Sequence, residues 1–151
     1  MRLKMKGWNL TGKGIPGDSV MTERKILVVD DDETIRYMLE KAFSRFGYTV
    51  RVAENGERAL EILKKEKIQV MFLDINMPGM DGLELCRRIR EGYPISVIHA
   101  MTGYGSLFEL SGCRQAGFDD YFRKPMDLEV LHKAAEEAFD KIDMWNITEQ
   151  G

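Results

Sequence analysis

The sequence predicts an α/β fold in which a doubly wound sheet of five parallel strands carries helices on both faces. Apolar runs of strand length alternate along the chain with segments whose apolar residues recur at helical spacing. The connections between these segments are short, as in folds built from successive strand–helix units. The run Val70–Leu73 is apolar at every position, which is typical of a strand that is buried on both faces of a parallel sheet.

Length and composition indicate one ordinary globular domain. The chain has 151 residues, 44% of them apolar and 31% charged, which is enough to bury a core. The net charge is −3, and the part after residue 25 is acidic, so we expect no direct nucleic-acid partner. No apolar run is long enough to cross a bilayer, so we expect no membrane partner either. Two cysteines without metal-like spacing, Cys86 and Cys113, and no secretory signal predict a cytoplasmic location.

The two ends of the chain are expected to lie outside the folded domain, which we place at residues 24–143. Residues 1–23 show neither helical nor strand periodicity and are rich in Gly and Lys, so we expect a disordered arm. Met21 is a candidate natural start, in which case the preceding residues are an added or upstream extension. Trp8 is the one residue of this arm suited to anchor a contact. We expect residues 144–151 to be a frayed tail.

The elements follow from periodicity and from the Gly and Pro residues that interrupt it. Strands are expected at residues 25–29, 48–52, 70–73, 95–101 and 121–123. Helices are expected at residues 35–46, 57–65, 83–89, 105–116 and 128–142. The helix over 105–116 contains Ser106, Ser111 and Gly112, which have poor helix propensity, so we expect it to be the least stable of the five.

Polar side chains follow four of the five expected strands, and they suggest a site. In an open α/β sheet the carboxyl ends of the strands meet at one edge, where ligands bind, so these residues should lie together: Asp30, Asp31, Asp74, Thr102 and Lys124. Three carboxylates at close range repel one another unless a cation lies among them. Oxygen ligands without His or Cys favour Mg²⁺ over zinc. A carboxylate beside Mg²⁺ can act as a nucleophile toward a phosphoryl group, with a lysine offsetting the charge.

Several polar residues have simpler interpretations. Asp74 itself is a possible turn cap, and Tyr121 a possible core residue. Asp32 falls where the first helix needs an N-cap, and Asp81 is expected to order the Pro/Gly-rich loop after Asp74. His99 lies within a strand and is expected in the core or at a sheet edge, and His132 on the surface of the last helix. Lys124-Pro125, directly after a strand, is a candidate for a cis peptide bond.

The sequence resembles the receiver domain of two-component response regulators over roughly residues 24–142. Four motifs carry the resemblance, in the order and with the separations of that family: Ile26–Asp31, Leu73–Gly82, Met101–Gly103 and Asp120–Pro125. The resemblance implies a flavodoxin-like sheet with strand order 2-1-3-4-5. It implies Asp74 as the acceptor of a phosphoryl group from a sensor histidine kinase.

The resemblance also implies roles for the surrounding residues. Mg²⁺ would be held by Asp31, by Asp74, by the backbone carbonyl of Asn76 and, through water, by Asp30. In the same way Thr102 would be the switch hydroxyl, Tyr121 the aromatic residue that moves with it, and Lys124 the partner of the phosphoryl group. Phosphorylation would then change the face formed by residues 105–116, the last strand and the last helix. Asn76 and Tyr104 are expected to tune a slow self-dephosphorylation.

The expected function is therefore that of a stand-alone phosphoacceptor and not of a turnover enzyme. Its output is either direct binding to a protein target or transfer of the phosphoryl group to a histidine phosphotransfer protein. We expect a monomer or a phosphorylation-dependent dimer. One alternative is a Mg²⁺-dependent phosphohydrolase that works through an aspartyl phosphate, but Asn76 stands where such enzymes carry a second acid. The other is an unphosphorylated scaffold with the same fold.

Overall fold

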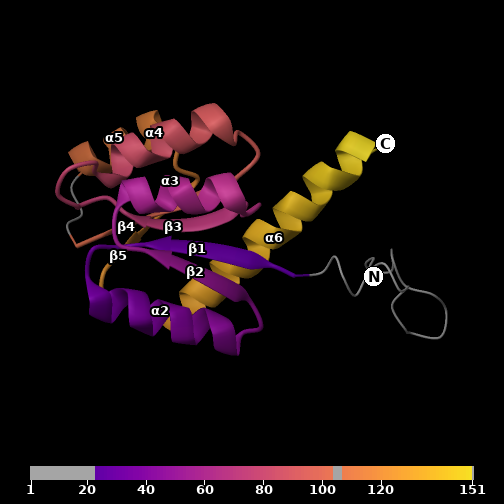
Figure 1. Ribbon diagram of the computed structural model, residues 1–151, viewed down its shortest axis with the longest axis horizontal. Coiled ribbons are helices and arrows are strands. Elements are labelled where there is room, and N and C mark those ends of the chain that lie inside the picture. The colour runs from indigo at the N-terminus through magenta and orange to yellow at the C-terminus, as the bar shows by residue number, and fades with distance from the viewer. Residues whose placement is uncertain (1–22, 104–106, 151) are drawn as a thin grey trace.

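The computed structural model describes residues 23–103 and 107–150 of the chain (Figure 1). The strands are β1 (Lys25–Val29), β2 (Thr49–Ala53), β3 (Val70–Asp74), β4 (Val97–Thr102) and β5 (Asp120–Arg123). The helices are α2 (Glu33–Arg45), α3 (Gly56–Lys65), α4 (Gly82–Gly92), α5 (Leu107–Ala116) and α6 (Leu128–Gln150). All strand pairs are parallel and the order is β2-β1-β3-β4-β5, so the predicted doubly wound fold and strand order are confirmed.

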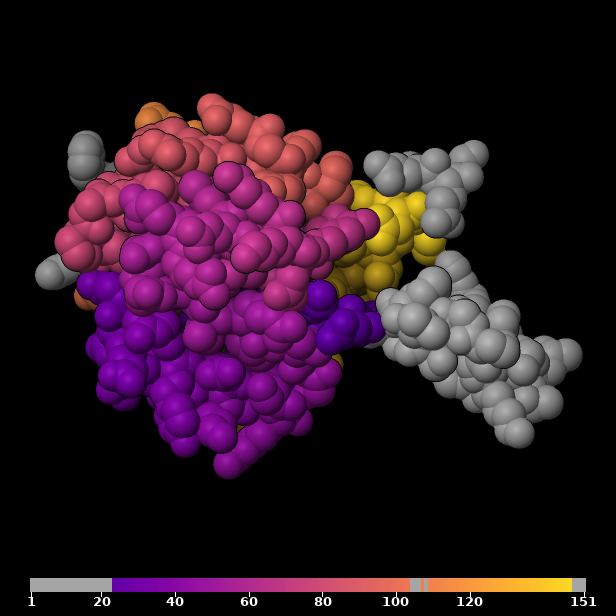
Figure 2. All heavy atoms as spheres, in the orientation of Figure 1, coloured from indigo at the N-terminus to yellow at the C-terminus, as the bar shows by residue number. Residues whose placement is uncertain are grey.

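The sheet is buried between two helical layers. In β1, Leu27 and Val29 pack with α3 and α4, while Ile26 and Val28 pack with α2 and α6. The same alternation recurs in β3, where every residue is buried. Figure 1 shows α3, α4 and α5 together on one side of the sheet, and Figure 2, in the same orientation, shows the magenta atoms of α3 above the indigo atoms of α2. Burial on both faces is the reason these strands are continuous apolar runs.

Short polar side chains begin three of the helices. Asp32 accepts hydrogen bonds from the N–H groups of Thr34 and Ile35, which confirms the predicted N-cap of α2. Asn55 caps α3 in the same manner. Asp81 caps α4, so it orders its loop by fixing the start of the next helix. Each cap of this kind contributes about 1 kcal/mol.

The C-terminal tail differs from the prediction. The expectation of a frayed tail over residues 144–151 is wrong for most of that segment, because α6 continues to Gln150. Trp145 packs against the same apolar cluster as Ile142, one turn earlier, and this contact extends the helix. Met144 and Ile147 lie on the other side of α6 and are exposed. The extension projects from the body of the domain in Figure 1.

Other boundaries moved by one to three residues. The fourth strand begins at Val97 and not at residue 95, where Ile95 is exposed. Residues 1–22, with Trp8 and Met21, lie outside the described residues, as do Tyr104, residues 105–106 of the predicted fourth helix and residue 151. Within the described part of the chain, no helix is long and apolar enough to cross a membrane.

The two histidines and the two cysteines take part in the packing of the fold. His99 is buried in β4, where its Nδ1 lies 2.9 Å from the Met71 carbonyl oxygen and its ring stacks on Phe72, so the core prediction is confirmed. His132 is half-buried and stacks on Phe46, which brings α6 against the end of α2. Both thiols are free and buried, and burial raises the pKa of Cys86 to about 12 and that of Cys113 to about 11.

Gly82 at the start of α4 packs directly against the end of β3. A Cβ at this position would overlap the carbonyl oxygen of Asp74 and lie 2.5 Å from the Cα of Ile75. Both are backbone atoms, which cannot move aside cheaply. We predict that Gly82→Ala lowers the free energy of unfolding by about 1–3 kcal/mol, measured by urea denaturation.

Gly92→Ala is the matched control for this prediction. Gly92 ends the same helix, and a Cβ there would have no neighbour within 4 Å. The control should leave the free energy of unfolding unchanged or raise it by up to about 1 kcal/mol. Equal stability of the two variants would show that the close approach of α4 to β3 is not required.

Candidate functional site

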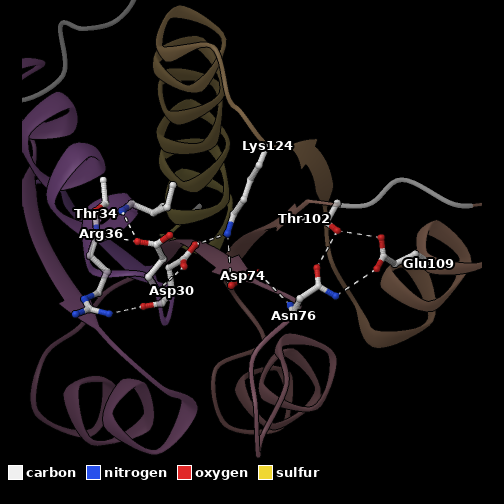
Figure 3. Close-up of polar contacts among 10 residues, drawn as sticks. Asp30, Thr34, Arg36, Asp74, Asn76, Thr102, Glu109 and Lys124 are labelled. Atoms are coloured by element: carbon white, nitrogen blue, oxygen red, sulfur yellow. Dashed lines mark hydrogen bonds and ion pairs between the residues drawn. The ribbon is translucent and has the colours of Figure 1, made fainter.

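The site is centred on Asp74, the last residue of β3. The residue is 2% exposed, and its Oδ1 accepts a hydrogen bond of 3.0 Å from the backbone N–H of Asn76. β1 pairs with β3 in a register that sets Val29 beside Leu73. Asp30, the residue after β1, is thereby brought next to Asp74 at the carboxyl edge of the sheet (Figure 3).

Three carboxylates gather at this edge. One carboxylate oxygen each from Asp30, Asp31 and Asp74 lies within 4.8 Å of the others. Asp30 is fully buried, whereas Asp31 is exposed. Asp30 Oδ1 accepts a hydrogen bond from the N–H of Asp32, which fixes the side chain in place. Asp30 Oδ2 is buried as well.

Lys124 supplies a positive charge beside the carboxylates. Its Nζ lies 2.8 Å from Asp30 Oδ2 and 3.5 Å from Asp74 Oδ2. Figure 3 shows the side chain reaching down between the two acids. Burial lowers the pKa of the Lys124 ammonium, but Asp30 and Asp74 outweigh burial and raise it above its ordinary value. The Lys124–Pro125 peptide bond is cis, as the sequence suggested.

The environment of Asp74 disfavours its charged form. Burial is the largest cause, and it raises the pKa of Asp74 to about 6. The N–H of Asn76 and the ammonium of Lys124 oppose this shift, while the neighbouring charges of Asp30 and Asp31 add to it. One lysine therefore does not neutralise the cluster, and the site favours a further cation.

The donor set fits a hard divalent cation. Carboxylate oxygens are the ligands that Mg²⁺ prefers, and among the described residues no His or Cys lies in the cluster. The exposure of Asp31 leaves this side of the site open to water, which Mg²⁺ retains when bound.

A second cluster of polar side chains lies beside the carboxylate cluster, at the end of β4. Thr102 is buried, and two acceptors for its single hydroxyl proton lie near Oγ1, Asn76 Oδ1 at 3.0 Å and Glu109 Oε1 at 2.9 Å. The Tyr121 hydroxyl donates to the same Glu109 oxygen at 3.4 Å. Asn76 Nδ2 donates to the other oxygen of Glu109 at 3.4 Å. Glu109 therefore connects α5 to β4, to β5 and to the loop after β3.

The structure thus divides the predicted site residues into two groups. Asp30, Asp31 and Lys124 surround Asp74, while Thr102 and Tyr121 meet at Glu109. Asn76 joins the two groups, because its backbone contacts Asp74 and its side chain contacts Thr102. The role expected for the backbone carbonyl of Asn76, as a metal ligand, remains a prediction.

Glu109 was missed in the sequence. It lies in the first turn of α5, where an acidic residue is expected on helix-dipole grounds alone. The sequence offers no spacing or motif that would have marked it as part of the site.

Comparison with known proteins gives a consistent result. The sequence model of the response regulator receiver domain matches residues 26–136. Response regulator MprA of Mycobacterium ulcerans is 41% identical over 107 residues, which are 71% of this chain and 46% of that protein. Sporulation initiation phosphotransferase F of Bacillus subtilis is 36% identical over 114 residues, 76% of this chain and 92% of that protein. The chain therefore spans about half the length of the MprA relative.

Solved structures show the same likeness. A CheY-like response regulator receiver domain protein from Methanospirillum hungatei superposes with a TM-score of 0.78 at 28% identity, over 82% of this chain and 98% of that chain. The chemotaxis protein CheY4 of Vibrio cholerae superposes with a TM-score of 0.75 at 29% identity, over 78% of this chain and 99% of that chain.

The raised pKa of Asp74 predicts a pH dependence of stability. The Asp74 pKa is about 6 in the folded protein against 3.8 ordinarily, so between these values the folded state binds more protons than the unfolded state. The contribution of Asp74 to stability is therefore lost as the pH rises through this window. We predict that Asp74→Asn, which carries no charge, is more stable than wild type by about 1–3 kcal/mol above about pH 7.

Urea denaturation without divalent cations, at several pH values, measures this difference. It should shrink to nothing below about pH 4, where both side chains are neutral. A difference that does not change with pH would contradict the assignment of the cost to the Asp74 charge.

Proposed function

This chain belongs to the response regulator receiver domain family, and on that basis we propose that Asp74 accepts a phosphoryl group from a sensor histidine kinase in a Mg²⁺-dependent reaction. The observation that carries the proposal is the buried Asp74 carboxylate, which lies beside two further acids and 3.5 Å from a lysine ammonium. A carboxylate nucleophile and groups that offset phosphoryl charge are the parts that phosphoryl transfer requires.

Each side chain then has a defined task. A carboxylate oxygen of Asp74 attacks phosphorus, so that a P–O bond forms while the bond from phosphorus to the donor breaks. Asp30, Asp31 and Asp74, with the backbone carbonyl of Asn76, would hold Mg²⁺, which offsets the charge on the phosphoryl oxygens. Lys124 leaves its position near Asp74 Oδ2 to pair with one of the new oxygens.

The phosphoryl group then changes the hydrogen bonds of the polar side chains around Glu109. It brings about −1.5 to −2 charges and three acceptor oxygens to the edge of the sheet. Thr102 Oγ1 donates to one of these oxygens, and Tyr121 moves into the space that Thr102 leaves. The surface formed by α5, β5 and α6 changes as a result, and a protein partner recognises the new surface.

Transfer of the phosphoryl group to a histidine phosphotransfer protein is the second candidate output. Sporulation initiation phosphotransferase F of Bacillus subtilis supports it, because its name describes a phosphotransferase and the match covers 92% of that protein. The phosphohydrolase alternative has less support, because the residue two positions after Asp74 is Asn76, which cannot transfer protons as an acid does.

The acceptor assignment predicts a specific covalent adduct. Wild-type protein incubated with acetyl phosphate and Mg²⁺ should gain about 80 Da in intact-mass spectrometry, as expected for one phosphoryl group. Asp74→Asn should gain nothing.

The control for that variant is Asp81→Asn. Asp81 is an acid of the same loop, and Asn also serves as an N-cap, so the control should gain the same mass as wild type. A wild type that stays unmodified, with hydrolysis slowed by rapid acid quenching, would favour the scaffold alternative.

The metal assignment predicts a difference between adjacent acids. Asp31→Asn should weaken Mg²⁺-dependent stabilisation and slow phosphorylation by at least about tenfold, because it removes an exposed metal ligand. Asp32→Asn also removes a charge, but it keeps the cap of α2 and should behave as wild type.

The measurement is the midpoint of thermal unfolding against Mg²⁺ concentration, together with the rate of adduct formation. Equal loss in the two variants would mean that only the summed charge of the loop matters, and not a defined metal site.

A further inference from the structure

Glu109 contacts the residues on which the proposed switch depends. Its carboxylate accepts from Thr102 Oγ1 at 2.9 Å, from the Tyr121 hydroxyl at 3.4 Å and from Asn76 Nδ2 at 3.4 Å. In Figure 3 it lies on the far side of Thr102 and Asn76 from Asp74. No part of the proposed phosphoryl transfer uses this residue.

The hydroxyl of Thr102 has a single proton to donate. In the structure two acceptors lie within 3.0 Å of Oγ1 and compete for that proton, Asn76 Oδ1 and Glu109 Oε1. A phosphoryl oxygen on Asp74 would be a further acceptor for the same proton. Thr102 can satisfy it only by giving up an existing partner, and hydrogen bonds to a carboxylate are stronger than those to a neutral amide.

Glu109 also fixes the start of α5. Among the described side chains of this helix, the buried ones are Cys113 and Ala116, both in its second half. Leu107, in the first turn, is 84% exposed. The polar contacts of Glu109 therefore tie the first half of α5 to the sheet, and in that half none of the described side chains is buried.

We propose that Glu109 is a competing acceptor that holds Thr102 and Tyr121 in the unphosphorylated arrangement, and that phosphorylation of Asp74 displaces it. The proposal rests on the proposed function and adds to it a positioning residue. Thr102 turns from the carboxylate to the phosphoryl oxygen, and the negative phosphoryl group repels Glu109. The first turns of α5 then lose their tie to β4 and β5, so the signal reaches the surface through a lost contact.

Removal of the competing acceptor should favour phosphorylation. Glu109→Ala should form the acetyl-phosphate adduct at least about threefold faster than wild type, because Thr102 is then available to the incoming phosphoryl group. Damage to the fold would slow the reaction, so an increase in rate separates this role from a purely structural one. Glu91→Ala is the matched control at the exposed end of α4, and it should react as wild type. If Glu109→Ala does not fold, Glu109→Gln takes its place; Gln weakens the competing acceptor without removing it, so a smaller increase over the wild-type rate is expected.

A double-mutant cycle tests whether Glu109 acts through the Thr102 hydroxyl. In a Thr102→Val background, which keeps the shape but removes the proton, Glu109→Ala should give no increase in rate. An undiminished increase there would overturn the proposal, since Glu109 would then act only as a nearby negative charge. A Glu109→Ala rate equal to that of wild type would overturn it as well.

Hydrogen exchange provides a readout that does not require phosphorylation. Without phosphodonor, amides of the first turns of α5 should exchange faster in Glu109→Ala than in wild type or Glu91→Ala. Phosphorylated wild type should show the same increase. Unchanged exchange in Glu109→Ala would show that Glu109 does not hold the start of α5, and would overturn the proposal. If Thr102→Val forms no adduct, so that the double-mutant cycle cannot be completed, this exchange comparison is the deciding test. If wild-type protein forms no adduct, the proposed function is refuted. The exchange comparison between wild type and Glu109→Ala then still measures whether Glu109 holds the start of α5.

Discussion

The organisation of this domain depends on two carboxylates that are buried at the end of parallel strands. Burial of Asp30 and Asp74 without full neutralisation is unfavourable, and Lys124 compensates for only part of the cost. The β1–β3 register brings the two acids together, and the close approach of α4 at Gly82 keeps the end of β3 in place. The stability of the surrounding fold thus holds a site that is itself unfavourable until a cation binds.

Asn76 joins the carboxylate cluster to the polar side chains around Glu109. Asn76 donates to Asp74 from its backbone and exchanges hydrogen bonds with Thr102 and Glu109 through its side chain. A change of charge at Asp74 therefore acts directly on the polar group that holds α5. This short path requires no movement of the buried strands, whose packing resists deformation.

The sequence predicted the parts of the structure that repeat a simple pattern. Apolar runs followed by polar residues identified the strands, and the parallel sheet then required Asp30, Asp74 and Lys124 to meet at one edge. Glu109 could not be predicted, because its position depends on how α5 lies against β4 and β5 and not on a local motif. The end of α6 was misjudged because the packing of Trp145 is a tertiary contact that outweighs weak local signals.

The central claim is that the Asp74 charge remains unfavourable until a divalent cation arrives, and proton release measures it most directly. Mg²⁺ should be titrated calorimetrically into the protein in two buffers of different ionisation enthalpy. Because the Asp74 pKa is about 6, binding near that pH should release about half a proton per Mg²⁺, and almost none near about pH 8. Asp74→Asn should release no proton from this position. Mg²⁺ binding near pH 6 without proton release by wild type would contradict the account.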